Sequence, residues 1–291
     1  MTLAALALAA ASQSGFVTLT LENDFFAGYD RHYTNGLQVA WTHGPDVVYA
    51  IGQRIYTPAD TGRELPDPAD RPYAGWLYGL ADIRRQHGDA TDHLAITAGI
   101  VGPASGARRT QSAAHRLLQE EPSQGWSSQL RNEPTLGLGF ERTWPSMMRT
   151  RIASQSLDFS PRFGVTIGNA LTYANVGAVV RFGQNLPSDV PAYHISLGPS
   201  RDGYRGTPVR GWYLWTGVDG RAVARNIFLD GNSTGDSPSV GRKPYGYDVQ
   251  GGIVYATPGM RIGFSVVRRS REFDGQASAD RFGQLTASWA Y

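Results

Sequence analysis

The sequence contains no cysteine, although it is 291 residues long. This absence excludes disulfide bonds, metal sites built on thiolates and cysteine nucleophiles. Long apolar runs are missing too. The longest extends from Leu3 to Ala11, whereas a membrane-spanning helix needs about 20 apolar residues. The sequence therefore predicts no transmembrane helix.

Charged residues are also scarce, at 18% of the chain against roughly 25% in a typical soluble domain. The 27 lysines and arginines nearly balance the 25 acidic residues and form no basic run, which argues against a nucleic-acid partner. By contrast, 41% of the residues are hydrophobic and 11% are aromatic. This composition excludes a disordered chain.

The first fifteen residues, MTLAALALAAASQSG, combine an Ala/Leu stretch with small polar residues. This combination is typical of the apolar and cleavage regions of a secretory signal, although no basic residue precedes it. We interpret residues 1–15 as a signal-peptide remnant; the alternative is a short alanine-rich helix of the mature protein. Residues 16–291 are then the folded domain.

From Phe16 onward, apolar and small or polar residues alternate with the period of a β-strand. In one example, Leu37, Val39 and Trp41 alternate with small or amide-bearing residues. About twelve such segments are predicted, near 16–23, 34–43, 46–56, 75–86, 92–102, 133–144, 150–168, 171–183, 210–227, 245–257, 260–273 and 281–291. Several reach the roughly 9–11 residues that a membrane-spanning strand needs.

The connections between these segments differ in length. Tight joints at 44–45, 168–170 and 258–259 contrast with long ones at 57–74, 103–132, 184–209 and 228–244. Short turns on one rim and long loops on the other are typical of outer-membrane barrels. The terminal Tyr291 resembles the export signature of such barrels. The predicted fold is an antiparallel transmembrane β-barrel of about 12 strands, with a soluble secreted β-sandwich as the alternative.

One stretch departs from the β pattern. Residues Thr110–Glu121 are rich in Ala, Leu, Arg, Gln and Glu, which predicts a short helix within a long extracellular loop, ended by Pro122. A helix in such a loop can cover a site.

Three polar clusters lie at strand ends or in loops: 22–24, 30–36 and the 111–121 helix. By strand parity, Glu22 and Asp24 face the same side as Thr18 and Thr20, predicted to be the lumen. Carboxylate and amide oxygens suit Ca²⁺, and a nearby histidine can activate water. Gln111 and His115 are four residues apart, so they share one helix face. The alternative is structural: a turn with Asx hydrogen bonds at 22–24 and an exposed histidine on the helix.

At these clusters the sequence resembles the lipid A 3′-O-deacylase (LpxR) family of twelve-stranded outer-membrane barrels. The matching segments are ENDFFAGYDRHYTNG (22–36), DRPYAGWLYG (70–79), the 111–126 region, GWSSQLRNEP (125–134), RNIFLDGN (225–232) and REFDGQ (271–276). Each alone is weak, but together they extend over nearly all of the chain after Gly15.

The resemblance implies a Ca²⁺-dependent hydrolysis of the 3′ ester of lipid A, with lipopolysaccharide as the partner and the bacterial outer membrane as the location. It implies that His115 is the base that activates water. It also implies that Asn23 and Asp24 belong to the metal or oxyanion site, with Glu121, preferred over Glu120, as the acidic metal partner. Thr34 would line this site, Gln111 would be a glutamine of the site, and Arg71 would contact a lipid phosphate.

Three other functions remain open at this point. They are a non-catalytic pore or binding barrel, a phospholipase acting on another lipid, and a soluble β-sandwich lectin. We expect a monomer.

Overall fold

The computed structural model describes residues 15–24, 32–44, 46–119, 121–186, 197–201, 204 and 210–291. Its strands are β1 (Phe16–Asn23), β2 (His32–His43), β3 (Val47–Thr57), β4 (Ala74–His87), β5 (Ala90–Val101), β6 (Glu133–Thr143), β7 (Met148–Ile152), β8 (Gln155–Gly168), β9 (Leu171–Gln184), β10 (Gly211–Asn226), β11 (Tyr245–Thr257), β12 (Met260–Arg269) and β13 (Asp280–Ala290). The helices are η2 (Pro103–Ser105), α2 (Ala107–Leu118), η3 (Gly125–Ser128) and α3 (Ile227–Asp230).

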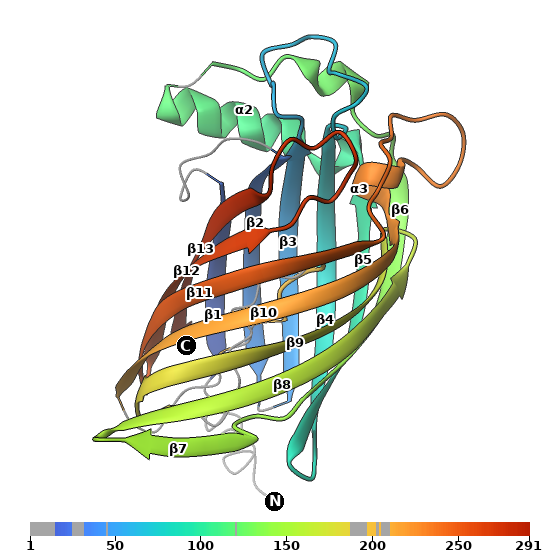
Figure 1. The fold of residues 1–291 in the computed structure, drawn as a ribbon. Helices are drawn as coiled ribbons and strands as arrows, with labels where there is room; N and C mark the ends of the chain where they lie inside the picture. The colour runs from blue at the N-terminus through green and yellow to red at the C-terminus, as the bar shows by residue number, and fades with distance from the viewer. Residues whose placement is uncertain are drawn as a thin grey trace, which may run out of the picture.

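The strands form a closed antiparallel barrel (Figure 1). β1 pairs with β13, and β8 pairs with β6 at one end and with the short β7 at the other. β7 thus continues the line of β6 after a break, and the described residues form a ring of twelve strands. The predicted fold is confirmed. One predicted segment, 150–168, is corrected: it spans two strands, because the chain reverses at Ala153, whose φ is 54°.

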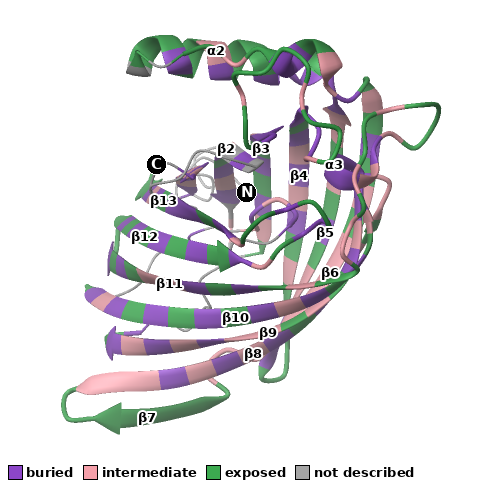
Figure 2. Cartoon of the chain, turned by 45° about the horizontal axis from the view of Figure 1, so that its top comes forward, coloured by how far each residue is buried: buried purple, intermediate pink, exposed green. Residues whose placement is uncertain are grey.

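The barrel carries its apolar residues on the outside. Along β12, Ile262, Phe264 and Val266 are 44%, 38% and 39% exposed, while the intervening Arg261 and Ser265 are buried in the lumen. Figure 2 shows this alternation on most strands. Water-soluble proteins bury their apolar faces, so an exposed apolar wall around a polar interior indicates contact with lipid. One closed ring is also incompatible with a β-sandwich.

The lumen is filled by side chains and by a segment of the chain. Ion pairs between neighbouring strands line it, including Arg181–Asp158, Arg162–Asp219 and Arg269–Asp248. Residues 197–201 and Tyr204 also lie inside, where the carbonyl oxygens of Ser200 and Tyr204 accept hydrogen bonds from Gln38 (3.0 Å) and Thr42 (2.8 Å) on β2.

At the end of the barrel that carries α2, which we call the helix rim, α3 closes the mouth. Phe228 of α3 is buried and stacks on Tyr56 of β3, with ring centroids 4.2 Å apart. The other side of the Phe228 ring packs near Trp76 of β4, at 5.7 Å. An aromatic core therefore closes the lumen at the helix rim.

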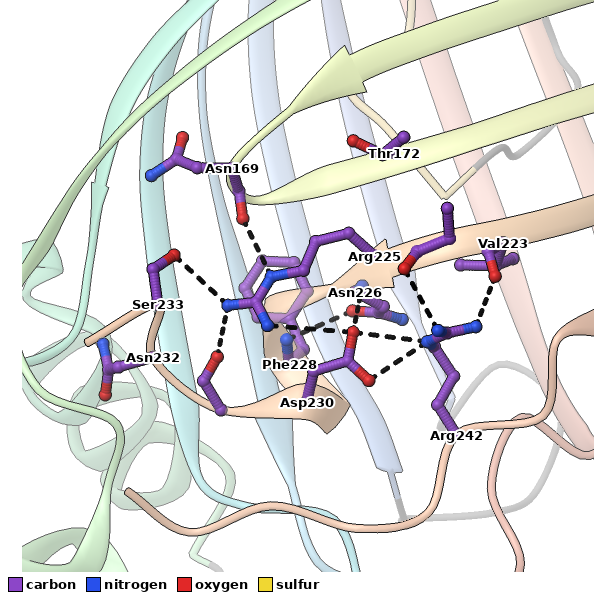
Figure 3. A network of polar contacts seen from close by, with 12 residues as sticks. Asn169, Thr172, Val223, Arg225, Asn226, Phe228, Asp230, Asn232, Ser233 and Arg242 are labelled. Atoms are coloured by element: carbon purple, nitrogen blue, oxygen red, sulfur yellow. Dashed lines mark hydrogen bonds and ion pairs between the residues drawn. The ribbon is translucent and has the colours of Figure 1, made fainter. Parts of the chain in front are cut away.

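A polar network fixes α3 in this position (Figure 3). The Asp230 carboxylate accepts a hydrogen bond from the Asn226 N–H at 2.7 Å and from Arg242 Nε at 3.0 Å. Arg225 donates to the carbonyl oxygens of Asn169 (3.3 Å) and Gly231 (2.7 Å). The mouth is thus held shut by buried and half-buried polar contacts as well as by aromatic packing.

The opposite end, where β1 begins and β13 ends, is the terminal rim. The predicted tight joints at 44–45 and 258–259 lie there, and the long connections 57–74, 103–132 and 228–244 lie at the helix rim. Two joints depart from the predicted rule: the tight 168–170 turn lies at the helix rim, and 184–209 joins its strands at the terminal rim. No helix among the described residues is long and apolar enough to cross a membrane. The predicted signal remnant lies outside the described residues except for Gly15.

Candidate functional site

The predicted loop helix is present as α2, which begins and ends three residues earlier than predicted, at Ala107 and Leu118. It follows Gly106, whose φ of 74° turns the chain from η2 into α2 in a conformation that glycine adopts easily. Gln119, at φ 61°, ends the helix, and its N–H donates to the carbonyl oxygen of His115. Ala, Arg, Gln and Leu dominate the helix and all favour this conformation.

α2 packs against the outer wall of the barrel at β3 and β4, and Figures 1 and 2 show it lying across the helix rim. Ala107 packs in a buried cluster with Ile55, Tyr73 and Trp126. A Cβ atom at Gly75 of β4 would overlap Ala107 and the Ser105 hydroxyl. The absence of a side chain at Gly75 therefore allows the helix to approach the wall closely.

The buried stripe of α2 is unusual because two of its members are polar. Ala107, Gln111 and His115, each four residues from the next, are 1%, 4% and 7% exposed. Polar side chains rarely occupy the buried face of a helix unless they have a partner or a function. The structure therefore brings the predicted Gln111 and His115 together on the helix face that meets the barrel.

Trp126 fixes the orientation of Gln111. Its indole N–H donates to Gln111 Oε1 at 2.7 Å, and its ring packs against Tyr73 at 4.9 Å. Because an indole nitrogen only donates, Oε1 must face it, so the amide NH₂ points elsewhere. That Nε2 atom is buried and has no hydrogen-bond partner among the described residues. A buried, unpaired N–H is costly and is suited to receive an oxygen of a bound molecule.

The main chain fixes the tautomer of His115. Its Nδ1 lies 2.6 Å from the carbonyl oxygen of Glu121. A carbonyl only accepts, so Nδ1 carries the hydrogen, and in the neutral ring Nε2 carries the lone pair. The Glu121 side chain itself is exposed, so in this structure Glu121 contacts His115 through its main chain. Glu120 lies outside the described residues.

Asn23 and Asp24 lie where β1 ends at the helix rim. The alternation of β1 places Asn23 on the outward side with the partly exposed Leu21. Asp24 is 2% exposed and follows the parity of the buried Thr20 and Glu22, as predicted.

Asn23 pairs with Asn35 of β2, next to Thr34. The main chain bulges at Thr34, because Tyr33 pairs with Tyr56 and Asn35 with Ile55. Bulges commonly redirect side chains beside functional sites; the Thr34 side chain lies outside the described part of the structure.

Arg71 lies on the other side of the wall. Its guanidinium is 1% exposed, lies over the Tyr56 ring at 5.1 Å and pairs with Glu272 at 3.3 Å. Burial alone would raise the pKa of Glu272, but Arg269, Arg71 and Arg221 together hold that pKa below its usual value. Arg71 therefore contacts Glu272 and Tyr56 on the lumen side, whereas Gln111 and His115 lie on α2.

Three residues that bind the side chains of predicted site residues or their neighbours were not identified from the sequence. They are Trp126, which orients Gln111, and Arg54 and Tyr33, which bind Glu22. Within the described ranges, no group of three or more His, Asp and Glu side chains is placed to hold a metal ion.

Comparisons with known proteins agree with this architecture. The structure of LpxR from Salmonella typhimurium superposes with a TM-score of 0.81 at 20% identity, covering 94% of this chain and 99% of that one. The NanC porin gives a TM-score of 0.43 at 6% identity, covering 94% of this chain and 98% of the porin chain. The beta domain of the Bordetella autotransporter BrkA gives a TM-score of 0.43 at 10% identity, covering 96% of this chain and 99% of that domain. A search of curated protein sequences finds no match. Because the family described as outer membrane protein LpxR matches residues 1–291, the chain belongs to that family, whose members lie in the bacterial outer membrane.

Proposed function

We propose that this protein is an esterase that removes the 3′-linked acyl (acyloxyacyl) group from lipid A. The observation that carries the proposal is the pair of polar side chains on the buried face of α2. His115 holds its lone pair on Nε2, and Gln111 holds an unpaired N–H. A base and a hydrogen-bond donor on one helix face are the minimal set for ester hydrolysis by water. Membership of the LpxR family supports the same reaction.

In the proposed reaction, His115 Nε2 takes a proton from water, and the water oxygen attacks the ester carbon. The Gln111 N–H, with the Asn23 amide, stabilises the negative charge that develops on the carbonyl oxygen. The imidazolium then returns its proton to the departing sugar alkoxide. The acyl chain would lie along the apolar outer wall, where Leu37 and Val39 are each 38% exposed.

Calcium remains part of the proposal. Asn23, Asp24 and Glu121 supply the oxygen donors that Ca²⁺ prefers, so the donor chemistry fits the ion. The described residues form no group of three acidic or histidine ligands, so water or main-chain oxygens would complete its shell. When bound, Ca²⁺ would polarise the ester carbonyl. Thr34 as a lining residue and Arg71 as a phosphate contact also remain proposals.

The test is to express the chain in a Gram-negative host and to measure lipid A by mass spectrometry. The wild-type protein should remove one 3-acyloxyacyl unit with Ca²⁺ and none with a chelator. His115→Ala should abolish the change, and Gln111→Leu should reduce its rate by roughly 10²–10³-fold. Arg108→Ala, on the exposed face of the same helix, is the matched control and should act like wild type.

The same experiment separates the alternatives. Fatty acid released from a glycerophospholipid, with lipid A unchanged, would identify a phospholipase. Unchanged lipids of both kinds, with a folded barrel, would favour a binding barrel. A pore is disfavoured because α3, Ser200 and Tyr204 occupy the lumen. We also propose that the barrel acts as a monomer, which mass measurement in detergent tests.

A further inference from the structure

Two arginines lie directly opposite each other on the outside of the barrel. Arg268 of β12 and Arg281 of β13 are register partners in the antiparallel ladder. Both are exposed, while their neighbours Arg269, Asp280 and Phe282 are buried. Like charges at directly opposite positions repel each other across a sheet.

The arginine pair lies where the apolar wall ends. The next outward residues toward the terminal rim are Val266 on β12, 39% exposed, and Leu285 on β13, 38% exposed, with Gly283 between Arg281 and Leu285. On β11, Val249, 45% exposed, is opposite Arg268, and Tyr247, 49% exposed, is the next outward residue toward the helix rim. Aromatic side chains at the edge of an apolar band mark the membrane–water interface. Arg268 and Arg281 are therefore at the level of the lipid headgroups.

The pair also adjoins the candidate site. β13 pairs with β1, and Gly283 is opposite Asn23. Arg281 is the next outward position toward the helix rim, about 7 Å further along β13, and neighbouring strands are about 4.8 Å apart. A headgroup bound by the arginines would thus lie roughly 10 Å from Asn23, on the same outer face.

We propose that Arg268 and Arg281 bind a phosphate of the substrate lipid and so determine the position of its headgroup at the site. The role of this phosphate site in positioning the substrate rests on the proposed function, whereas the binding experiment below tests phosphate recognition separately from hydrolysis. Guanidinium groups bind phosphate oxygens in pairs and through charge-assisted hydrogen bonds, and a phosphate between them would relieve their repulsion. Arg268 makes no hydrogen bond or ion pair with the described residues. Arg281 has a further interaction within the chain, so the first substitution is made at Arg268.

The kinetic test uses Arg268→Gln and, as a matched control, Arg85→Gln, which removes an exposed outward arginine near the terminal rim. Substrates are lipid A and the same lipid with its phosphates removed. Arg268→Gln should lower kcat/KM for phosphorylated lipid A about tenfold, mainly through KM. It should change the value for the dephosphorylated lipid by less than about twofold. An equal loss on both substrates, or no loss on either, would overturn the proposal.

A binding test separates this proposal from the proposed reaction. It uses the whole barrel in detergent with His115→Ala as background, so that no hydrolysis occurs. Phosphorylated lipid A should bind about tenfold more weakly when Arg268→Gln is added, and the dephosphorylated lipid should bind equally to both. If wild type proves inactive but this difference appears, the phosphate site stands and the esterase proposal fails. If hydrolysis occurs without any phosphate preference in binding, the esterase stands and the phosphate site fails.

Discussion

Replacing Trp126 with phenylalanine tests whether the indole N–H positions a catalytic donor. In the structure this N–H is 2.7 Å from Gln111 Oε1, and it is the contact that directs Gln111 Nε2 away from Trp126. Phenylalanine keeps an aromatic ring against Tyr73, whose centroid is 4.9 Å away. The substitution therefore removes a hydrogen bond with little loss of packing.

The magnitude follows from the burial of Gln111. An amide oxygen left buried without a donor costs about 1–3 kcal/mol. Without the indole N–H nothing holds Oε1 on that side, and rotation of the Gln111 amide moves Nε2 away from the developing oxyanion. Since each 1.36 kcal/mol corresponds to tenfold in rate, we expect kcat to fall about 10- to 100-fold. Removing the donor entirely, in Gln111→Leu, should cost roughly 10²–10³.

The assay is steady-state release of the acyl chain from purified lipid A in detergent, with kcat and KM determined separately. Trp126→Phe should lower kcat and leave KM within about threefold, because the donor acts on charge that develops only in the transition state. Tyr73→Phe is the control. The Tyr73 hydroxyl donates a long bond of 3.4 Å to the Thr61 carbonyl, whereas Gln111 Oε1 accepts its bond from Trp126, so the kcat of this variant should stay within about twofold. A wild-type kcat in Trp126→Phe would refute the positioning role.

Three further outcomes follow from the fold. Gly75→Val should lower activity by roughly 10²-fold with an unchanged circular dichroism spectrum, because the new side chain would displace α2; full activity would contradict close packing there. The lowered pKa of Glu272 means that its carboxylate stabilises the fold at neutral pH and that this contribution is lost as pH falls through the lowered pKa. The hydrogen-exchange rates of residues 270–279, corrected for intrinsic rates, should therefore increase in wild type as the pH is lowered. In Glu272→Gln the same rates should already be higher than those of wild type at pH 7. Planar bilayers should show no steady conductance, because Phe228 and its partners close the lumen; stable single-channel currents would contradict this.

The barrel could be predicted from the sequence because each strand carries its own alternating pattern of lipid-facing and lumen-facing residues. Alternation along each strand is set by the two faces of a single wall, so Leu37, Val39 and Trp41 reveal the lipid side without knowledge of any partner strand. The reversal between β7 and β8 could not be found this way. Ala153 turns the chain although its sequence carries no Gly, Pro or Asn signal, and the residues on both sides keep a strand-like pattern.

The filled lumen was also beyond sequence reasoning. Ser200 and Tyr204 lie inside the barrel through contacts of their main-chain oxygens with the side chains of Gln38 and Thr42 on a distant strand. Main-chain contacts leave no residue pattern. The same limit applies to His115, whose tautomer depends on the Glu121 carbonyl rather than on the carboxylate that the sequence drew attention to.

The closed lumen and the position of α2 together determine where a substrate can enter. A pore-like route is blocked by α3 at the helix rim and by Ser200 and Tyr204 further down. Gln111 and His115 instead lie on the helix face that meets the outer wall, beside the exposed apolar surface of the barrel. An ester at the level of the headgroups, with its acyl chain in the bilayer, can reach these groups by lateral diffusion without leaving the membrane. The arginine pair on β12 and β13 lies on that same outer face, so recognition and hydrolysis would both occur from the membrane side of the barrel.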